Sequence, residues 1–95
     1  MLESQRKPLS RQDMFLGRLL SECSAVGRIA VNFSTRKLRR MPVQSVLHLR
    51  VQLPTLGAYE KFSPIYDKFK YVFLVEHYQV YEEKDFIYFD LVVIL

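Results

Sequence analysis

Four cationic side chains lie close together in the middle of the chain, and their chemistry suits them to phosphate binding. They are Arg36, Lys37, Arg39 and Arg40. An arginine guanidinium can form two parallel hydrogen bonds to one phosphate, so several on one hairpin could straddle a nucleic-acid backbone. The same run also fits a solvated loop, or a nuclear-import address in a eukaryote. No zinc-ligand spacing, helix-turn-helix pattern or ribonucleoprotein aromatic motif accompanies it.

The charge of the chain is divided unevenly between its halves. Residues 1–50 hold ten Lys and Arg against three acids, a balance of +7, whereas residues 51–95 hold four Lys against seven acids, a balance of −3. A basic half indicates an anionic partner, either nucleic acid or an acidic protein surface. It can also complement the chain's own acidic half, within one molecule or between subunits.

Polar side chains alternate with apolar ones on both sides of the basic run. This period of two predicts half-buried strands, one starting at Arg28 and a longer one over residues 43–53, joined by the basic connection as a hairpin. Arg28, His48 and Arg50 fall on the polar face. We expect these three side chains to extend the anion-binding surface of the hairpin.

Eleven of the thirteen aromatic residues lie in residues 51–95, among acids rather than arginines. Core packing or a protein interface therefore explains them better than stacking on bases. Strands predicted at about 71–81 and 86–95 are apolar on both faces, which requires cover on both sides. Asp90 interrupts the second of them and needs a partner, either an arginine of the basic half or a neighbouring subunit. We expect the following residues to form an oligomer interface: Tyr78, Phe86, Tyr88, Val92 and Ile94.

Residues that could support catalysis or bind a metal ion are scattered. Glu76 and His77 are adjacent in a predicted strand, so we expect them to point to opposite faces. His48 stands alone on another strand, and Cys23 belongs to the apolar stripe of a predicted helix. The three glycines make no phosphate-cradling loop. The sequence therefore predicts no enzyme activity, no metal and no cofactor.

Two segments have helical spacing. Ser10 and Asp13 form a capping-box pattern, the apolar stripe of Leu16, Leu19, Leu20 and Cys23 follows, and Gly27 is a stop signal, so we expect a helix over about 10–25. Residues 55–69 also have helical spacing, but Pro64 lies inside it. We expect two short helical turns there, with Ser63 capping the second. The acidic segment 82–85 is the expected turn between the last two strands.

Together these patterns predict one α+β domain over residues 1–95, with residues 1–8 as a frayed tail and the order α-β-β-α-β-β. A single cysteine and the lack of a secretory or membrane segment fit the cytoplasm, or the nucleus in a eukaryote. The favoured function is a small non-enzymatic module that holds RNA or DNA phosphates. The alternative is an assembly subunit that forms a homo- or hetero-oligomer through its apolar last strands, with its basic face on an acidic protein surface.

Overall fold

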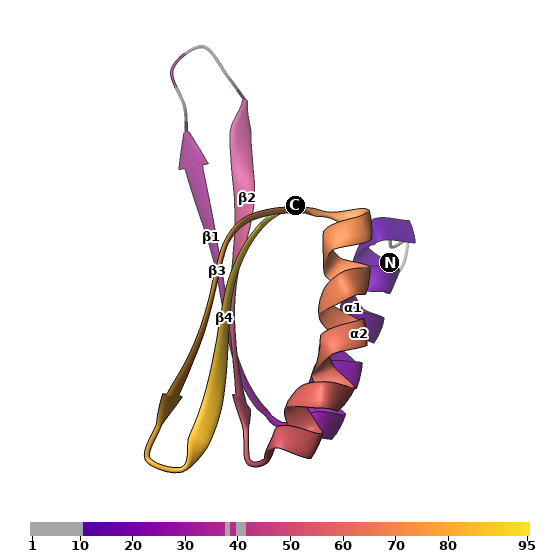
Figure 1. Ribbon diagram of the computed structural model, residues 1–95. Coiled ribbons are helices and arrows are strands. Elements are labelled where there is room, and N and C mark those ends of the chain that lie inside the picture. Colours follow the sequence, from indigo (N-terminus) through magenta and orange to yellow (C-terminus); the bar gives the residue numbers. More distant parts are fainter. Residues whose placement is uncertain (1–10, 38, 40–41) are drawn as a thin grey trace, which may run out of the picture.

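Two helices cover one face of a four-stranded antiparallel sheet, and the other face is open (Figure 1). The computed structural model describes residues 11–37, 39 and 42–95, and it has the predicted order of elements. The strands lie in the order β1-β2-β4-β3. The elements are α1 (Arg11–Val26), β1 (Arg28–Lys37), β2 (Val43–Leu53), α2 (Leu56–Val72), β3 (Leu74–Glu83) and β4 (Phe86–Ile94).

The apolar stripe of α1 is confirmed. Leu16, Leu19 and Cys23 are buried, and Phe15 and Leu20 pack beside them. The expected capping box includes Ser10, which lies outside the described residues. Gly27 follows the helix, and its amide donates to the carbonyl of Cys23. An added Cβ at Gly27 would lie well inside 3.0 Å of the Gln52 carbonyl oxygen, so a glycine is needed where α1 meets the end of β2.

The prediction of two short turns around Pro64 is wrong, because α2 is one continuous helix. Thr55 caps it by accepting a hydrogen bond from the Ala58 amide at 3.0 Å. Its buried stripe is Phe62, Ile65 and Phe69, and these side chains gain cover only if the helix remains intact across Pro64. Pro64 is exposed, and so is Glu60, whose carbonyl loses its amide partner, so water can solvate that carbonyl.

The strand β3 differs from the prediction in its start, in its end and in a bulge. β3 begins at Leu74 and extends to Glu83. Only Lys84 and Asp85 therefore form the turn before β4. Both have positive φ, 49° and 69°, as in the two-residue turns that match strand twist. A β-bulge also lies between Val75 and His77. It places Val75 opposite Val93 on the helix side and His77 opposite Val92 on the open side, although the sequence pattern puts both on one face.

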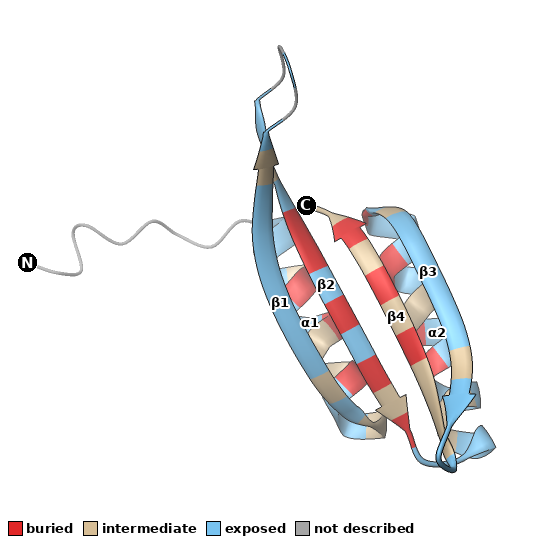
Figure 2. Ribbon diagram, turned by 90° about the vertical axis from the view of Figure 1, so that its left-hand side faces the viewer, coloured by how far each residue is buried: buried red, intermediate tan, exposed pale blue. Residues whose placement is uncertain are grey.

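The core lies between the helices and the inner face of the sheet. Leu47, Leu49, Val51 and Leu53 alternate along β2 as predicted and are almost completely buried. Phe89 of β4 sits among the aromatic rings of α2, with its ring centroid 4.8 Å from that of Phe62. The buried positions alternate along the central strands (Figure 2). Within the described residues, neither helix is long and apolar enough to span a membrane.

The β1–β2 hairpin is longer than predicted. The sequence pattern breaks at Ser34, yet the two strands stay paired as far as Lys37 and Val43. β4 pairs with β2 only as far as Val46, so the end of the hairpin projects beyond the sheet (Figure 2). We call this projecting part, residues 34–45, the arm; its structural description omits residues 38, 40 and 41. Arg36 and Lys37 of the basic segment therefore lie in β1, which fixes the directions of these two side chains, whereas Arg39 lies in a turn.

Candidate nucleic-acid interface

The open face of the sheet is built from four rows of side chains that cross all four strands. We use "open face" for these sixteen residues, which point away from α1 and α2. From the end opposite the arm, the rows are Arg28, Gln52, Tyr88 and Tyr81; Ala30, Arg50, Asp90 and Gln79; Asn32, His48, Val92 and His77; and Ser34, Val46, Ile94 and Leu74. The open face combines amides, imidazoles, guanidinium groups and phenol rings.

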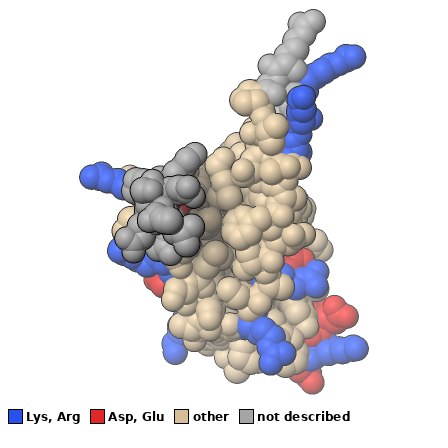
Figure 3. Space-filling view, turned by 180° about the vertical axis from the view of Figure 1, so that it is seen from behind, with Lys and Arg blue, Asp and Glu red and all other residues tan. Residues whose placement is uncertain are grey.

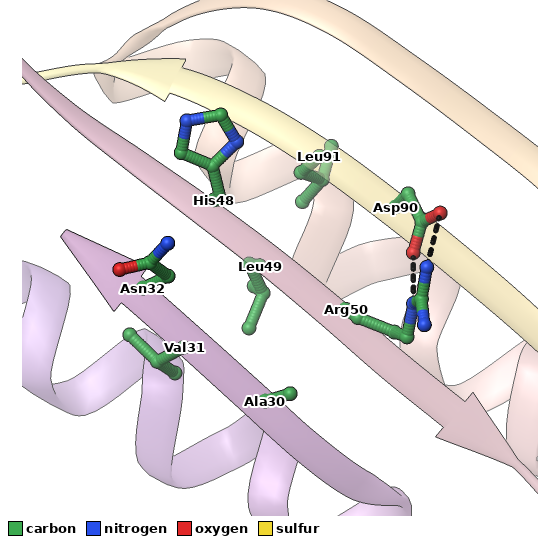
Figure 4. Close-up of a pocket in the computed structure, with 8 residues that line it drawn as sticks. All are labelled: Ala30, Val31, Asn32, His48, Leu49, Arg50, Asp90 and Leu91. Carbon is green, nitrogen blue, oxygen red and sulfur yellow. Dashed lines mark hydrogen bonds and ion pairs between the residues drawn. The ribbon is translucent and has the colours of Figure 1, made fainter. Parts of the chain in front are cut away.

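Arg50 and Asp90 pair across the two central strands (Figure 4). Arg50 donates through Nε to Asp90 Oδ1 at 2.9 Å and through Nη2 to Oδ2 at 3.5 Å. This hydrogen bonding raises the pKa of Arg50. The partner expected for Asp90 is thus an arginine of the same chain. The Arg50 side chain remains 56% exposed, so the pair contributes little to stability and can exchange partners.

Arg36 is also held by an acidic residue of the second half. Its Nε donates to the Gln44 side chain at 3.2 Å, and its Nη1 donates to Glu76 Oε1 at 2.9 Å, with a second contact from Nη2 to Oε2. The hydrogen bond from Arg36 lowers the pKa of the Glu76 carboxyl. The charge division seen in the sequence is therefore partly balanced inside one molecule.

Three of the predicted cations have no acidic partner within the described part of the chain. They are Arg28, at one end of β1, and Lys37 and Arg39, on the arm. All three are exposed. Lys37 follows Arg36 in a strand and points to the opposite face of the arm, as a straddling arrangement requires. The fourth predicted arm residue, Arg40, lies outside the described residues.

The arm concentrates positive charge at one end of the molecule. Figure 3 shows basic but no acidic side chains at the projecting tip, while basic and acidic side chains are mixed over the lower half of that view. Arg28 lies nine residues from Lys37 along β1, which corresponds to about 30 Å at the usual rise of a strand. The structure therefore separates two cationic regions, one at the tip of the arm and one at the end of the open face opposite the arm.

Two stacked tyrosines form a site that the sequence interpretation missed. The rings of Tyr81 and Tyr88 are 5.2 Å apart at an interplanar angle of 17°. The Arg50 guanidinium lies 5.9 Å from the Tyr88 ring centroid, and the Gln52 side chain donates to the Tyr88 hydroxyl at 3.0 Å. Tyr88 was expected only at an oligomer interface. The alternation of Arg50 and Gln52 with apolar residues along the chain is the signal that could have placed Tyr88 beside these two side chains.

Two shallow hollows adjoin this cluster on the β1 side. One has a volume of about 260 Å³ and is lined by residues that include Ala30, His48, Arg50 and Asp90 (Figure 4). The other has a volume of about 170 Å³ and is lined by residues that include Arg28, Ala30, Arg50 and Tyr88. Ala30 belongs to both because its small side chain leaves room between its larger neighbours.

The residues expected at an oligomer interface are divided between the faces. Tyr78 lies on the helix side, where its ring is 6.0 Å from that of Phe89. Tyr88, Val92 and Ile94 lie on the open face, and Phe86, two residues from Tyr88, points the same way. No helix of the described residues covers these four side chains, although they are partly shielded by their neighbours. The outward face of β4 is thus open to a partner.

The residues considered for catalysis or metal binding do not converge. The expected opposite directions of Glu76 and His77 are wrong, because the bulge brings the Glu76 carboxylate to Arg36, on the same side as His77. Even so, no group of three potential metal ligands exists among the described residues. Burial raises the pKa of the Cys23 thiol to about 12, so it is not a thiolate at neutral pH.

Comparison of the chain with protein-family models, with curated proteins and with solved structures finds no match. Any functional conclusion therefore depends on the site itself.

Proposed function

We propose that this protein is a small nucleic-acid-binding module that contacts phosphates with the arm and with the open face. The observation that supports this function best is the projecting hairpin with exposed Lys37 and Arg39, joined through Arg36 to the open face. A two-stranded β-ribbon fits the major groove of a duplex, and cations on both sides of a ribbon can reach both walls of the groove. The buried thiol and the lack of any described membrane-spanning helix are compatible with a cytoplasmic or nuclear location.

The two ion pairs do not prevent this function. The Arg36 and Arg50 guanidinium groups bind carboxylates in the same forked geometry that suits phosphate. Both pairs are substantially exposed, so exchanging a carboxylate for a phosphate costs little. Arg28, Lys37 and Arg39 need no exchange and would make the first contacts.

Salt-dependent binding tests the proposal. Each phosphate contact contributes about −0.9 to the slope of log K against log salt for a duplex and about −0.7 for a single strand. Changing Arg28, Lys37 and Arg39 together to Gln should reduce the slope by about 2 to 3 and weaken binding to any sequence. Fluorescence anisotropy with labelled oligonucleotides over a salt series measures both effects.

A matched control is a variant with the same change in net charge on the helices, which lie on the opposite side of the sheet from the open face. Arg11, Arg18 and Lys61 are exposed on α1 and α2. Changing these three to Gln should leave the slope almost unaltered. If the two triple variants lose affinity equally, binding reflects net charge alone and the proposed surface is wrong.

The second candidate function, an assembly subunit, is supported by apolar side chains at the arm end of the open face. Leu74 is 67% exposed and lies in the same row as the half-buried Ile94, whereas Val46 of that row is already buried. A second copy or another protein could cover this row together with Val92. Light scattering over a concentration series tests self-association. A monomer at every concentration, unchanged by Leu74→Ser, would count against the homo-oligomer.

A further inference from the structure

The open face offers planar groups in a column, and such a column suits a nucleobase. The Tyr81 and Tyr88 rings are stacked, and the Arg50 guanidinium continues the series over Tyr88. Arginine and tyrosine both stack on bases of any sequence. The 170 Å³ hollow begins where this column ends, between Arg50 and the exposed Arg28.

The floor and rim of the two hollows supply the other requirements of a base site. Ala30 has the smallest side chain of the open face, and its neighbour in the row is Arg50. The space above β1 at Ala30 is therefore free, and both hollows include it. The amide of Asn32 and the imidazole of His48 line the larger hollow, and Gln52 lines the smaller one. These groups can donate to and accept from the edge of a base, while Arg28 remains free to bind the adjoining phosphate.

A duplex cannot present a base to this site. Four strands about 4.8 Å apart place the outer strands roughly 14 Å from each other, and their side chains widen the surface further. The major groove is about 12 Å wide, so it admits the two-stranded arm but not the four-stranded face. The smaller hollow lies at the end of the sheet opposite the arm, and the larger one lies over the middle of the sheet. A base that reaches them must be unpaired, as every base of a single strand is, whereas a duplex would first have to release one from its stack.

We propose that the open face is a binding site for single-stranded nucleic acid, with one base seated over Ala30 against the Arg50–Tyr88–Tyr81 column and its phosphate on Arg28. This inference rests on the proposed function and specifies its ligand. The arm then binds phosphates in any strand form, while the open face distinguishes unpaired bases from paired ones.

The test compares three probes on the unaltered protein by fluorescence anisotropy. They are oligo(dT) of about 12 nucleotides, within the usual site size of single-strand binders, a duplex of the same length, and an abasic strand with the same number of phosphates. Stacking of one base should make oligo(dT) bind about 5- to 150-fold more tightly than the abasic strand. Oligo(U) as a fourth probe distinguishes a DNA from an RNA preference.

Two variants locate the effect. Ala30→Leu fills the hollow without changing charge, and Tyr88→Leu removes the ring that lines the smaller hollow and supports the Arg50 guanidinium. Each should lower the affinity for oligo(dT) to that for the abasic strand and leave abasic binding unchanged. Ala25→Leu, the same type of substitution at an exposed position of α1 on the helix side, is the control and should bind like the unaltered protein, with circular dichroism confirming that all variants fold.

The possible outcomes separate the two proposals. Equal, salt-dependent binding of oligo(dT), duplex and abasic strand would overturn the base site and leave the phosphate-binding function standing. Tighter oligo(dT) binding that neither variant reduces would overturn the placement of the base over Ala30. A protein that binds none of the probes at low salt would refute both proposals.

Discussion

Replacement of Gly27 by Ala should destabilise the fold more than its small size suggests. The new Cβ would approach the carbonyl oxygen of Gln52 to well inside 3.0 Å and the Leu53 Cδ2 atom to 3.1 Å. The first contact is with backbone in the strand ladder next to Arg28, so it cannot be relieved by rotating a side chain. Overpacking of this kind typically costs about 1–3 kcal/mol, and we expect the upper part of that range.

Gly17, inside α1, provides the matched control. A Cβ added there meets nothing within 4 Å, and the residue lies in the exposed part of α1. Gly17→Ala should therefore stabilise the protein by about 0.5–1 kcal/mol through helix propensity. The two substitutions are chemically identical and opposite in expected sign, which separates crowding from any general effect of the added methyl group.

Thermal and urea unfolding measure the difference. For a domain of this size, each kcal/mol changes the melting temperature by about 4–8 °C, so Gly27→Ala should lower it by roughly 8–24 °C. The urea midpoint should fall without a change in slope if the native state stays compact. A neutral or stabilising Gly27→Ala would refute the close contact between α1 and the end of β2.

Three further predictions follow from buried, paired and helix-breaking groups. Cys23, which is fully buried with its pKa raised to about 12, should react with a thiol reagent only after unfolding, and rapid reaction of the folded protein would contradict the packing of α1. Because the pKa of Glu76 is lowered, its ion pair stabilises the fold at pH values above the usual carboxyl pKa, and this contribution is lost as the pH falls through the pKa of the folded state. Arg36→Gln should raise the pKa of Glu76 towards its usual value in an NMR titration, and an unchanged pKa would exclude the pair in solution. Pro64→Ala should stabilise α2 by about 1–3 kcal/mol in urea unfolding, because the exposed proline breaks a helical hydrogen bond; a destabilised variant would show that the proline contributes to packing.

Local patterns were sufficient to predict most elements of this fold. The i, i+3, i+4 spacing of Leu16, Leu19 and Leu20 predicts α1, and strict alternation over residues 43–53 predicts both β2 and the direction of each of its side chains. These signals are reliable because each element must turn its apolar residues to one side. They failed at Pro64, where burial of Phe62 and Phe69 on one helix outweighed the local cost of the proline.

The candidate site was less predictable because its parts come together only across strands. Arg28, Arg50 and His48 were correctly placed on one polar face by their alternation along the chain. The stacking of Tyr81 on Tyr88 depends on the β3–β4 register, and the position of β3 was obscured by the bulge at Glu76. A bulge shifts the alternation by one residue, and no residue type in this segment signals it.

The division of charge illustrates what each level determines. The sequence by itself determined that cations gather in the first half and acids in the second, because that division is a property of the order of residues along the chain. Only the tertiary structure decided which cations are balanced: Arg36 meets Glu76 and Arg50 meets Asp90, each forty residues away along the chain. The pairing follows from strand order, because β4 inserts between β2 and β3 and brings the acidic half alongside the basic half. Arg28, Lys37 and Arg39 have no acidic partner in the described residues: Arg28 lies at the end of β1 opposite the arm, Lys37 points to the opposite face from Arg36, and Arg39 lies in a turn of the arm.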